Sequence, residues 1–287
     1  MPATPIAPAE RTKNIKYAVR DVLALADEAK ARGLDLLHLN IGDPNIYGFS
    51  PPAAVAEAAI RAIHDNLNGY APSDGTTAAL SAIRQDAEAR GTKAIQHIAI
   101  TSGCSEAIEI ALSALVNAGD RVLVPAPGYP LYTAILAKLD AVAVPYHLDE
   151  SNDWQPDVDE ITSLLSTPAK ALVLINPNNP TGTRLAADEV IALAASAPGT
   201  LVVVDELYEA FTGDSVLPCA DFTVTPNLLV LRSLAKTAGL AGLRIGFAIG
   251  HADVVDRVSR VTGPYDVNSV AVAAAFAALA DQSFVDA

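Results

Sequence analysis

The sequence predicts an α/β protein in which helices cover both faces of a mostly parallel sheet. From about residue 95, short apolar or β-branched runs alternate with helical segments. Near-continuous apolar strands of this kind are typical of a sheet that is buried on both sides. Polar residues follow several of the runs, at Asn176, Asp205 and Ser233. Because ligands bind at the carboxyl ends of strands in open α/β sheets, we expect these groups to share one rim.

The N-terminal part of the chain predicts helices that end or begin at glycine and proline. After a Pro-containing arm over 1–14, a helix ends at Gly33, a common helix stop. The run 34–44 predicts a short strand that enters a Gly-Asp-Pro turn. A second helix has its prolines in the first turn, where the missing N–H costs nothing. The predicted helices are 19–33, 50–66 and 77–91, and the later strands are 97–101, 120–125, 141–147, 170–176, 200–206, 227–233 and 245–250.

Composition narrows the class of protein. The 287 residues are 51% hydrophobic, which is ample for a large core. A net charge of −14 without a basic run argues against nucleic acid and anionic membranes as partners. Two cysteines, Cys104 and Cys219, fit a reducing compartment. Residues 1–14 lack a signal pattern, and the apolar run 270–280 is too short to span a bilayer, so we expect a cytoplasmic protein.

Two loops after predicted strands have binding potential. In "TSGCSEAI" a strand ends at Thr101 and a helix begins, so the N–H groups of Gly103, Cys104 and Ser105 form a potential anion site. Taken alone, the motif is more simply an ordinary strand–turn–helix with Ser105 as a cap. In "INPNNPTGT" two Asn-Pro steps specify a rigid loop. Its length favours an Asn side chain fixed at the rim over turn formation alone.

Two charged residues stand in apolar surroundings. Asp205 ends a run that should be buried, where an unpaired carboxylate is costly. A helix cap or structural salt bridge would explain such a residue, and suits Glu206 well, whereas a functional Asp205 needs a buried cationic partner. Tyr208 follows one helical turn later. One predicted strand further on, Lys236 has small or apolar neighbours, and burial would make its amine neutral and nucleophilic. The alternative is a lysine that reaches solvent.

Together these groups meet the needs of pyridoxal 5′-phosphate. Its aldehyde needs a lysine, its ring nitrogen needs an aspartate, and its phosphate needs N–H donors and a cation. Ser233 and Arg244 flank the lysine and could bind the phosphate. No metal site is expected.

The chain resembles the class I/II aminotransferases of the fold type I pyridoxal-phosphate family, especially their alanine aminotransferase-like branch. The resemblance runs over essentially the whole chain, and its most specific motifs are "PAPGYPLY", "NPNNPTG", "DELY" and "SLAKTAGLAGLRIGF". Further matches are "NIKYAVRDV", "LNIGDPNIYGF", "GYAPSDGT" and "TSGCSEAI". It implies a three-layer α/β/α transferase domain with a mostly parallel sheet, plus an incomplete small domain.

The resemblance also implies roles at the cofactor. Lys236 is expected to be the Schiff-base lysine and proton shuttle, and Asp205 the partner of the pyridinium nitrogen. Tyr208 and Asn179 are expected to donate to the ring's phenolate oxygen, and Tyr129 to stack on the ring. The residues expected at the phosphate are Gly103, Cys104, Ser105, Ser233 and Arg244.

Other roles concern the substrate and a second subunit. Tyr70 resembles a tyrosine that reaches the phosphate across a homodimer interface. Gly42 is expected to line the pocket for the substrate carboxylate, which Asn179 also reaches. Tyr17 and Arg20 match residues that cover the site; alternatively they are an aromatic anchor and a solvated helix residue.

The same resemblance sets the expected domains. Residues 1–45 are expected to be an N-terminal arm and part of the small domain, and 46–287 the large cofactor-binding domain. The chain stops where a long interdomain helix would begin, so we expect a C-terminally truncated protein. The C-terminal small domain, with the arginine that binds the substrate carboxylate, would be absent. Impaired turnover and exposed apolar surface on 1–45 would follow.

The expected activity is amino transfer from alanine, aspartate or a similar amino acid to a 2-oxo acid such as 2-oxoglutarate. A C–S β-lyase or decarboxylase is an alternative, because the motifs bind the cofactor without choosing the bond that breaks. A non-catalytic sensing domain, as in some transcription regulators, would need a DNA-binding module that the first 45 residues are too few and insufficiently basic to supply. A fragment that does not fold stably is the remaining alternative.

Overall fold

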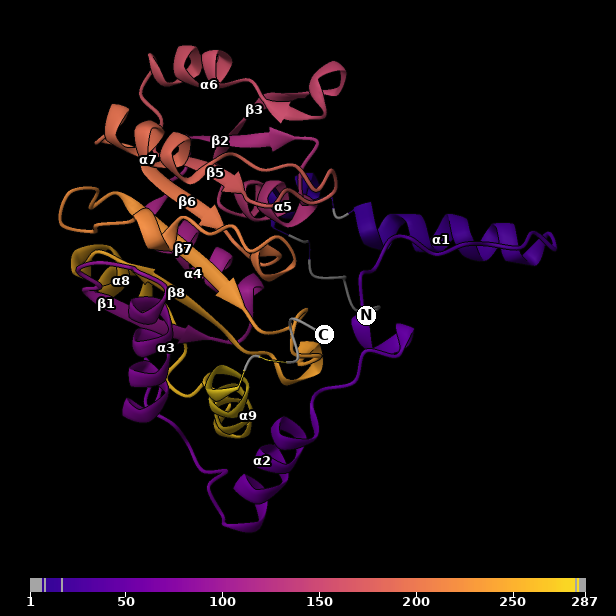
Figure 1. The fold of residues 1–287 in the computed structure, drawn as a ribbon. Coiled ribbons are helices and arrows are strands. Elements are labelled where there is room, and N and C mark those ends of the chain that lie inside the picture. The colour runs from indigo at the N-terminus through magenta and orange to yellow at the C-terminus, as the bar shows by residue number, and fades with distance from the viewer. Residues whose placement is uncertain (1–6, 8, 17, 282, 284–287) are drawn as a thin grey trace, which may run out of the picture.

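A central sheet organises the computed structural model, which describes residues 7, 9–16, 18–281 and 283. In that part of the chain eight strands pair in the order β1-β8-β7-β6-β5-β2-β3-β4 (Figure 1). The strands are β1 (His97–Thr101), β2 (Arg121–Ala126), β3 (Val142–Asp149), β4 (Gln155–Pro156), β5 (Ala171–Ile175), β6 (Leu201–Asp205), β7 (Leu228–Ser233) and β8 (Gly246–Gly250). The run from β7 to β3 is parallel, while β8 is antiparallel to both neighbours and β4 to β3. The predicted fold class is therefore confirmed.

Helices cover both faces of the sheet, which makes three layers (Figure 1). One face packs against α3, α6, α7 and α9, and the other against α4, α5 and α8. Helix α2 lies against α9. The helices are α1 (Ala18–Ala31), α2 (Ala53–His64), α3 (Thr77–Ala89), α4 (Cys104–Leu115), α5 (Pro130–Lys138), α6 (Val158–Leu165), α7 (Ala187–Ser196), α8 (Ala252–Ser259) and α9 (Ser269–Ala280). No helix of the described residues has the length and apolar character that crossing a membrane requires.

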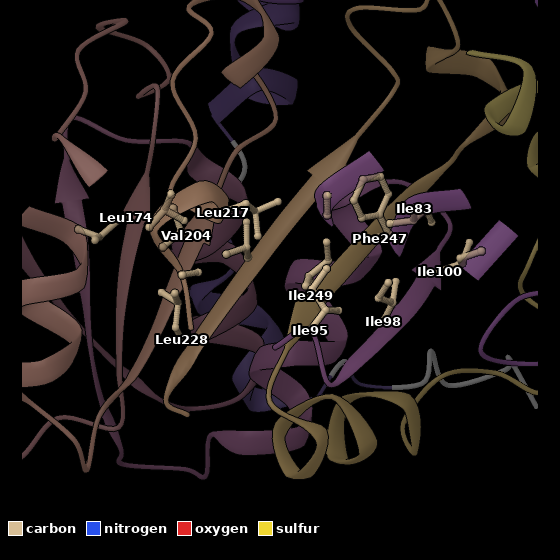
Figure 2. Close-up of a cluster of buried hydrophobic side chains, with 14 of the residues drawn as sticks. Ile83, Ile95, Ile98, Ile100, Leu174, Val204, Leu217, Leu228, Phe247 and Ile249 are labelled. Atoms are coloured by element: carbon tan, nitrogen blue, oxygen red, sulfur yellow. The ribbon is translucent and has the colours of Figure 1, made fainter. Parts of the chain in front are cut away.

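Side chains of each central strand alternate between two apolar clusters, as the period of a strand requires. Val204 and Leu228 belong to the cluster beneath α3, α7 and α9, part of which Figure 2 shows. Val203 and Leu229, one residue away on the same strands, belong to the cluster beneath α4, α5 and α8. Both faces of the sheet are therefore buried, which explains the near-continuous apolar runs of the sequence.

The register brings the predicted site segments to one rim. Gly246, at the start of β8, lies opposite Thr101 at the end of β1 and opposite Ser233 at the end of β7. Asp205, at the end of β6, pairs with Leu231 and with Ile175 of β5. The carboxyl ends of β1, β7, β6 and β5 thus meet along one edge, as predicted.

The N-terminal segment differs from the prediction in one respect. Helix α1 extends away from the sheet (Figure 1). The strand predicted over 34–44 is wrong, because residues 34–43 have no regular secondary structure and no partner strand. Leu37 and Leu39 are 83% and 80% exposed there. Alternating apolar residues form a strand only where another strand satisfies their backbone groups.

Candidate active site

Asp205 is anchored at the end of β6 by neutral donors. Its side chain is 3% exposed. Oδ2 accepts a hydrogen bond from the Tyr132 hydroxyl at 2.9 Å, and Oδ1 accepts from the Leu207 N–H at 3.1 Å and the Cys104 thiol at 3.4 Å. Burial raises the pKa of the Asp205 carboxyl, and these three hydrogen bonds partly oppose that rise. Burial also raises the pKa values of the Cys104 thiol and the Tyr132 phenol, so both remain protonated donors at neutral pH.

The described residues offer Asp205 no ion pair. A buried carboxylate without a nearby cation keeps part of its desolvation cost even when it is hydrogen-bonded. The buried cationic partner that the sequence predicted is therefore not a side chain of this part of the protein. The arrangement suits a positively charged group of a ligand.

Lys236 lies on the loop after β7 and is half-buried. Burial lowers the pKa of its amine, and the Arg244 charge lowers it further, while Asp43 raises it. Nζ donates a hydrogen bond to the Gly42 carbonyl oxygen. A lysine with a lowered pKa is more often neutral, and the neutral amine is the nucleophilic form.

Gly42 reaches the lysine because the N-terminal segment crosses the loop after β7. Asn45 donates to the Gly239 carbonyl at 3.3 Å. A Cβ atom at Gly42 would lie 3.9 Å from the Tyr208 hydroxyl and 4.0 Å from Lys236 Nζ. Both distances are ordinary van der Waals contacts, so a methyl group would fit there but would take up space beside the two groups.

Gly42, Tyr208 and Lys236 line one cavity of about 450 Å³. Its walls include Gly42, Tyr47, Phe49, Tyr208, Phe211 and Lys236. Tyr208 is half-buried, and burial together with the nearby Asp205 charge raises the pKa of its phenol, which stays a donor at neutral pH. The structure thus brings Lys236, Tyr208 and Gly42 together.

The Asn-Pro loop lies beside this cavity. Asn179 and Tyr208 both line a neighbouring space of about 360 Å³. Asn178 forms the turn, because its Oδ1 accepts from the N–H and hydroxyl of Thr181. Asn176 anchors the loop through two hydrogen bonds with the backbone of Leu185. Asn176 and Asn178 therefore hold the loop in shape, and Asn178 and Asn179 both line the neighbouring space.

The predicted anion site has the expected geometry. Gly103 adopts φ 80° and precedes α4, so the N–H groups of Cys104 and Ser105 open the helix. The Gly103 N–H is already bonded to the Thr101 carbonyl oxygen at 2.8 Å. Within the described part of the chain, the N–H groups of Cys104 and Ser105 have no acceptor. Free N–H groups at a helix N-terminus attract anions.

Arg244 lies directly beside this turn. It has φ 56°, and its guanidinium donates to the carbonyl oxygens of Ala241 and Ser102 at 3.1 and 3.4 Å. A Cβ atom at Gly103 would approach Arg244 Nη2 to 2.6 Å. The glycine therefore allows the cation to sit against the helix N-terminus.

Ser233 faces the same rim but is engaged locally. Its hydroxyl donates to the Ile245 carbonyl at 2.7 Å and accepts from the Ala235 N–H at 3.1 Å. In this structure the side chain braces the loop that carries Lys236. Its predicted contact with a phosphate remains a prediction.

The remaining predicted residues lie further out. Tyr129 is half-buried and precedes α5. Tyr70 is 84% exposed, and its ring packs on that of Tyr265 with centroids 4.4 Å apart. Tyr17 lies outside the described residues, and Arg20 lies in the first turn of α1, for whose side chain no position is described. The roles of these four residues stay predictions.

Sequence reasoning missed two groups. Tyr132 was overlooked although it follows Tyr129 by one helical turn, a spacing that places both side chains on one face. Arg232 was overlooked although it is a lone cation in the apolar strand β7, where a carboxylate partner is required. Glu206 is that partner, at 3.7 Å, so the predicted structural salt bridge of Glu206 is present.

The fold and this arrangement define a class of protein. The chain belongs to the class I and II aminotransferases, whose family pattern matches residues 35–287. It is 35% identical over 254 residues to the glutamate-pyruvate aminotransferase AlaA of Escherichia coli K12, covering 86% of this chain and 62% of that protein. The alanine aminotransferase of Mycobacterium tuberculosis H37Rv is 32% identical over 249 residues, covering 84% and 58%.

Solved structures of aminotransferases share the fold of this chain. The alanine aminotransferase from Pyrococcus furiosus superimposes with a TM-score of 0.86 at 29% identity, covering 98% of this chain and 75% of that one. The Thermus thermophilus aspartate aminotransferase with maleate gives 0.87 at 27% identity, with the same coverage. The chain thus spans about three fifths of the length of the AlaA relative.

Proposed function

We propose that the protein is a pyridoxal-phosphate-dependent aminotransferase in which Lys236 binds the cofactor's aldehyde. The observation that carries the proposal is Asp205, a buried carboxylate that only neutral donors hold, at the same rim as a lysine of lowered pKa. A protonated pyridine nitrogen would supply the missing cation.

The residues present fit this cofactor. Cys104 and Ser105 offer N–H groups for the phosphate, with Arg244 beside them as the cation. Tyr208 and Asn179 line a shared space and would donate to the ring oxygen. Tyr129 would stack on the ring, and Ser233 would complete the phosphate site.

Bound pyridoxal phosphate supplies a carbonyl for the incoming amino group and a ring that accepts electrons from the substrate's α-carbon. The protein's own groups do the rest. Lys236 Nζ, whose pKa is lowered, would take the α-proton of the substrate and deliver it at the carbon that carried the cofactor's aldehyde. Asp205 would face the ring nitrogen, and Tyr208 would keep its proton because burial raises the pKa of its phenol. Tyr47, Phe49 and Phe211 would give the substrate apolar contacts at the cavity wall.

The proposed substrates are alanine, aspartate or a similar amino acid, with a 2-oxo acid such as 2-oxoglutarate as acceptor. Support comes from relatives named glutamate-pyruvate and alanine aminotransferases and from the likeness to an aspartate aminotransferase. Gly42 and Asn179 would contact the substrate carboxylate, and Tyr17 and Arg20 would cover the site. We further propose that 46–287 is the cofactor-binding domain and 1–45 belongs to a small domain.

A homodimer is part of the proposal. Most of the Tyr70 side chain is exposed on its own subunit. An exposed tyrosine of this kind suits a side chain that would complete the phosphate site of a second copy. Size-exclusion chromatography with light scattering tests the assembly directly.

The decisive test adds pyridoxal phosphate to the parent and to Lys236→Ala. Visible absorbance from the lysine adduct is expected for the parent only. Borohydride should abolish that absorbance and convert the adduct to a stable amine, which peptide mass spectrometry should locate at Lys236. Alanine with 2-oxoglutarate should then yield pyruvate and glutamate at an impaired rate, as expected for this chain. A Lys236→Ala protein with the same absorbance refutes the lysine assignment, and ammonia release from a cysteine conjugate indicates a β-lyase instead.

A further inference from the structure

A buried ion cluster lies behind the candidate active site. Arg232, the residue before the last of β7, is 7% exposed, and its guanidinium pairs with the carboxylates of Glu206, at 3.7 Å, and Glu209. These glutamates are 1% and 4% exposed. Asp205 faces the opposite side of the sheet, toward Cys104, so the ion cluster is separate from the groups that hold it.

The two glutamates flank Tyr208 in the chain. Glu206 comes directly after β6, and Glu209 begins the single helical turn Glu209–Phe211. Glu206 also accepts from the Ser215 hydroxyl at 2.7 Å and the Val216 N–H at 2.6 Å. The segment 206–216 is therefore tied to the Arg232 guanidinium through Glu206 and Glu209, and its end is bonded to the Glu206 carboxylate.

Stability alone is a weak reason for such a cluster. Removing ions from water costs about as much as their attraction returns, so apolar residues of similar volume often serve as well. Burial raises the pKa of the Glu206 carboxyl and lowers that of the Arg232 guanidinium, and their attraction opposes both changes. A buried ion cluster does, however, fix one geometry, because a guanidinium binds carboxylates in a directed fork.

The position of the cluster indicates what it fixes. A small cavity of about 30 Å³ beside it is lined by Arg232, both glutamates, Ala210 and Thr237. Ala210 and Thr237 also line the large cavity that contains Tyr208 and Lys236. The cluster thus borders a cavity that the Tyr208 segment and the Lys236 loop also line.

We propose that Arg232 is a positioning residue, which holds the Tyr208 turn against the Lys236 loop through Glu206 and Glu209. The inference rests on the proposed function for what Tyr208 contacts. Arg232 itself touches neither substrate nor cofactor, and its effect on cofactor binding passes through Tyr208.

The first experiment measures backbone hydrogen exchange in the 287-residue chain without added cofactor. In Arg232→Met, which keeps the apolar stem, the amides of 209–213 should lose about tenfold protection, the usual value of one charged hydrogen bond. The matched control is Arg184→Met, because Arg184 pairs with Asp214 of the same segment at 2.7 Å but is about half exposed. Equal exchange of the segment in parent and Arg232→Met overturns the proposal.

The second experiment asks whether Arg232 acts through Tyr208. The dissociation constant of pyridoxal phosphate is measured by equilibrium dialysis for the parent, Arg232→Met, Tyr208→Phe and the double variant. A loss of about tenfold in Arg232→Met that disappears in the Tyr208→Phe background supports the proposal. Additive losses contradict it and assign Arg232 a purely structural role.

The proposal can still be tested if Arg232→Met does not fold. Glu209→Gln removes one charge and keeps the shape, and it should loosen 209–213 in the same direction by a smaller factor. If Arg232→Met does not fold, unchanged exchange in Glu209→Gln overturns the proposal. If the parent does not bind pyridoxal phosphate, the proposed function fails while the exchange data still decide whether Arg232 holds the turn.

Discussion

The Tyr132 hydroxyl donates a hydrogen bond to Asp205 Oδ2 across 2.9 Å, which joins α5 to the end of β6. Both side chains are almost fully buried. The bond explains how a carboxylate remains fixed in apolar surroundings. Removing the Tyr132 hydroxyl should therefore change the pKa of Asp205 directly.

Tyr132→Phe removes a hydrogen bond that lowers the pKa of Asp205, so that pKa should rise further. A less charged Asp205 holds a protonated ring nitrogen less well. We expect the dissociation constant of pyridoxal phosphate to increase by about tenfold, the value of one hydrogen bond to a charged group. Equilibrium dialysis measures it.

Tyr146→Phe is the matched control. Tyr146 is equally buried, and its hydroxyl donates to the Val173 carbonyl at 2.9 Å, away from Asp205. This variant should lose about 1 kcal/mol of stability and keep the parent's cofactor affinity. Equal affinity losses in the two variants would show that Tyr132 acts through packing alone.

Asp205→Asn should stabilise the protein while weakening cofactor binding. Since burial raises the folded-state pKa of Asp205 above its ordinary 3.8, the folded state binds the proton more tightly than the unfolded state. Stability is therefore lost as pH rises from 3.8 through the raised pKa, and the penalty persists at neutral pH. The Tyr132 hydroxyl can accept as well as donate, so the amide still finds a partner.

Urea unfolding of parent and Asp205→Asn, between pH 4 and pH 7, measures this effect. The advantage of the variant should grow with pH and reach a plateau at neutral pH. A variant less stable than the parent at pH 7 contradicts the prediction.

Gly246→Ala should damage the anion site. A Cβ atom there would lie 2.6 Å from the Gly103 carbonyl carbon and 2.7 Å from the Cys104 nitrogen, both backbone atoms. Relieving the overlap must shift β8 or the start of α4, at a cost of about 1–3 kcal/mol. Gly242→Ala is the control, since nothing lies within 4 Å of its added Cβ. Urea unfolding and phosphate affinity distinguish them, and equal behaviour would refute the expectation.

Lys236 should react with pyridoxal phosphate at a pH below the ordinary amine pKa of 10.5, because burial lowers its pKa. The initial rate of adduct formation should rise with pH as the neutral amine becomes populated. Asp43 raises this pKa, so Asp43→Asn should shift the rate profile to lower pH and speed the reaction at neutral pH. Asp35→Asn, in the same exposed segment, should leave the profile in place; a shift to higher pH in Asp43→Asn would reverse the assignment.

Much of the fold follows from the sequence because the sheet is buried. A strand such as 201–205 needs apolar residues on both faces, and this leaves a continuous run that is easy to find. The antiparallel direction of β8 was not predictable, because burial depends on composition and not on strand direction. The two-residue strand β4 is too short to leave a pattern.

The site residues that could be predicted are charged residues in otherwise apolar segments. Lys236 and Asp205 stand in apolar segments, and the structure places both at the rim. Tyr132 gives no such contradiction, because a tyrosine fits an apolar helix face without any role. Its hydrogen bond to Asp205 depends on how α5 packs on the sheet, which local sequence does not specify.

The adjacent acids at the end of β6 have a consequence for assembly. Asp205 points to Cys104 and Tyr132 on one face, and Glu206 points to Arg232 on the other. A slip of one residue would exchange the two faces and give each carboxylate the wrong neighbours. If Asp205 binds pyridoxal phosphate as proposed, a chain that binds the cofactor must already have β6 in its correct register, so cofactor binding would report that the sheet has assembled correctly.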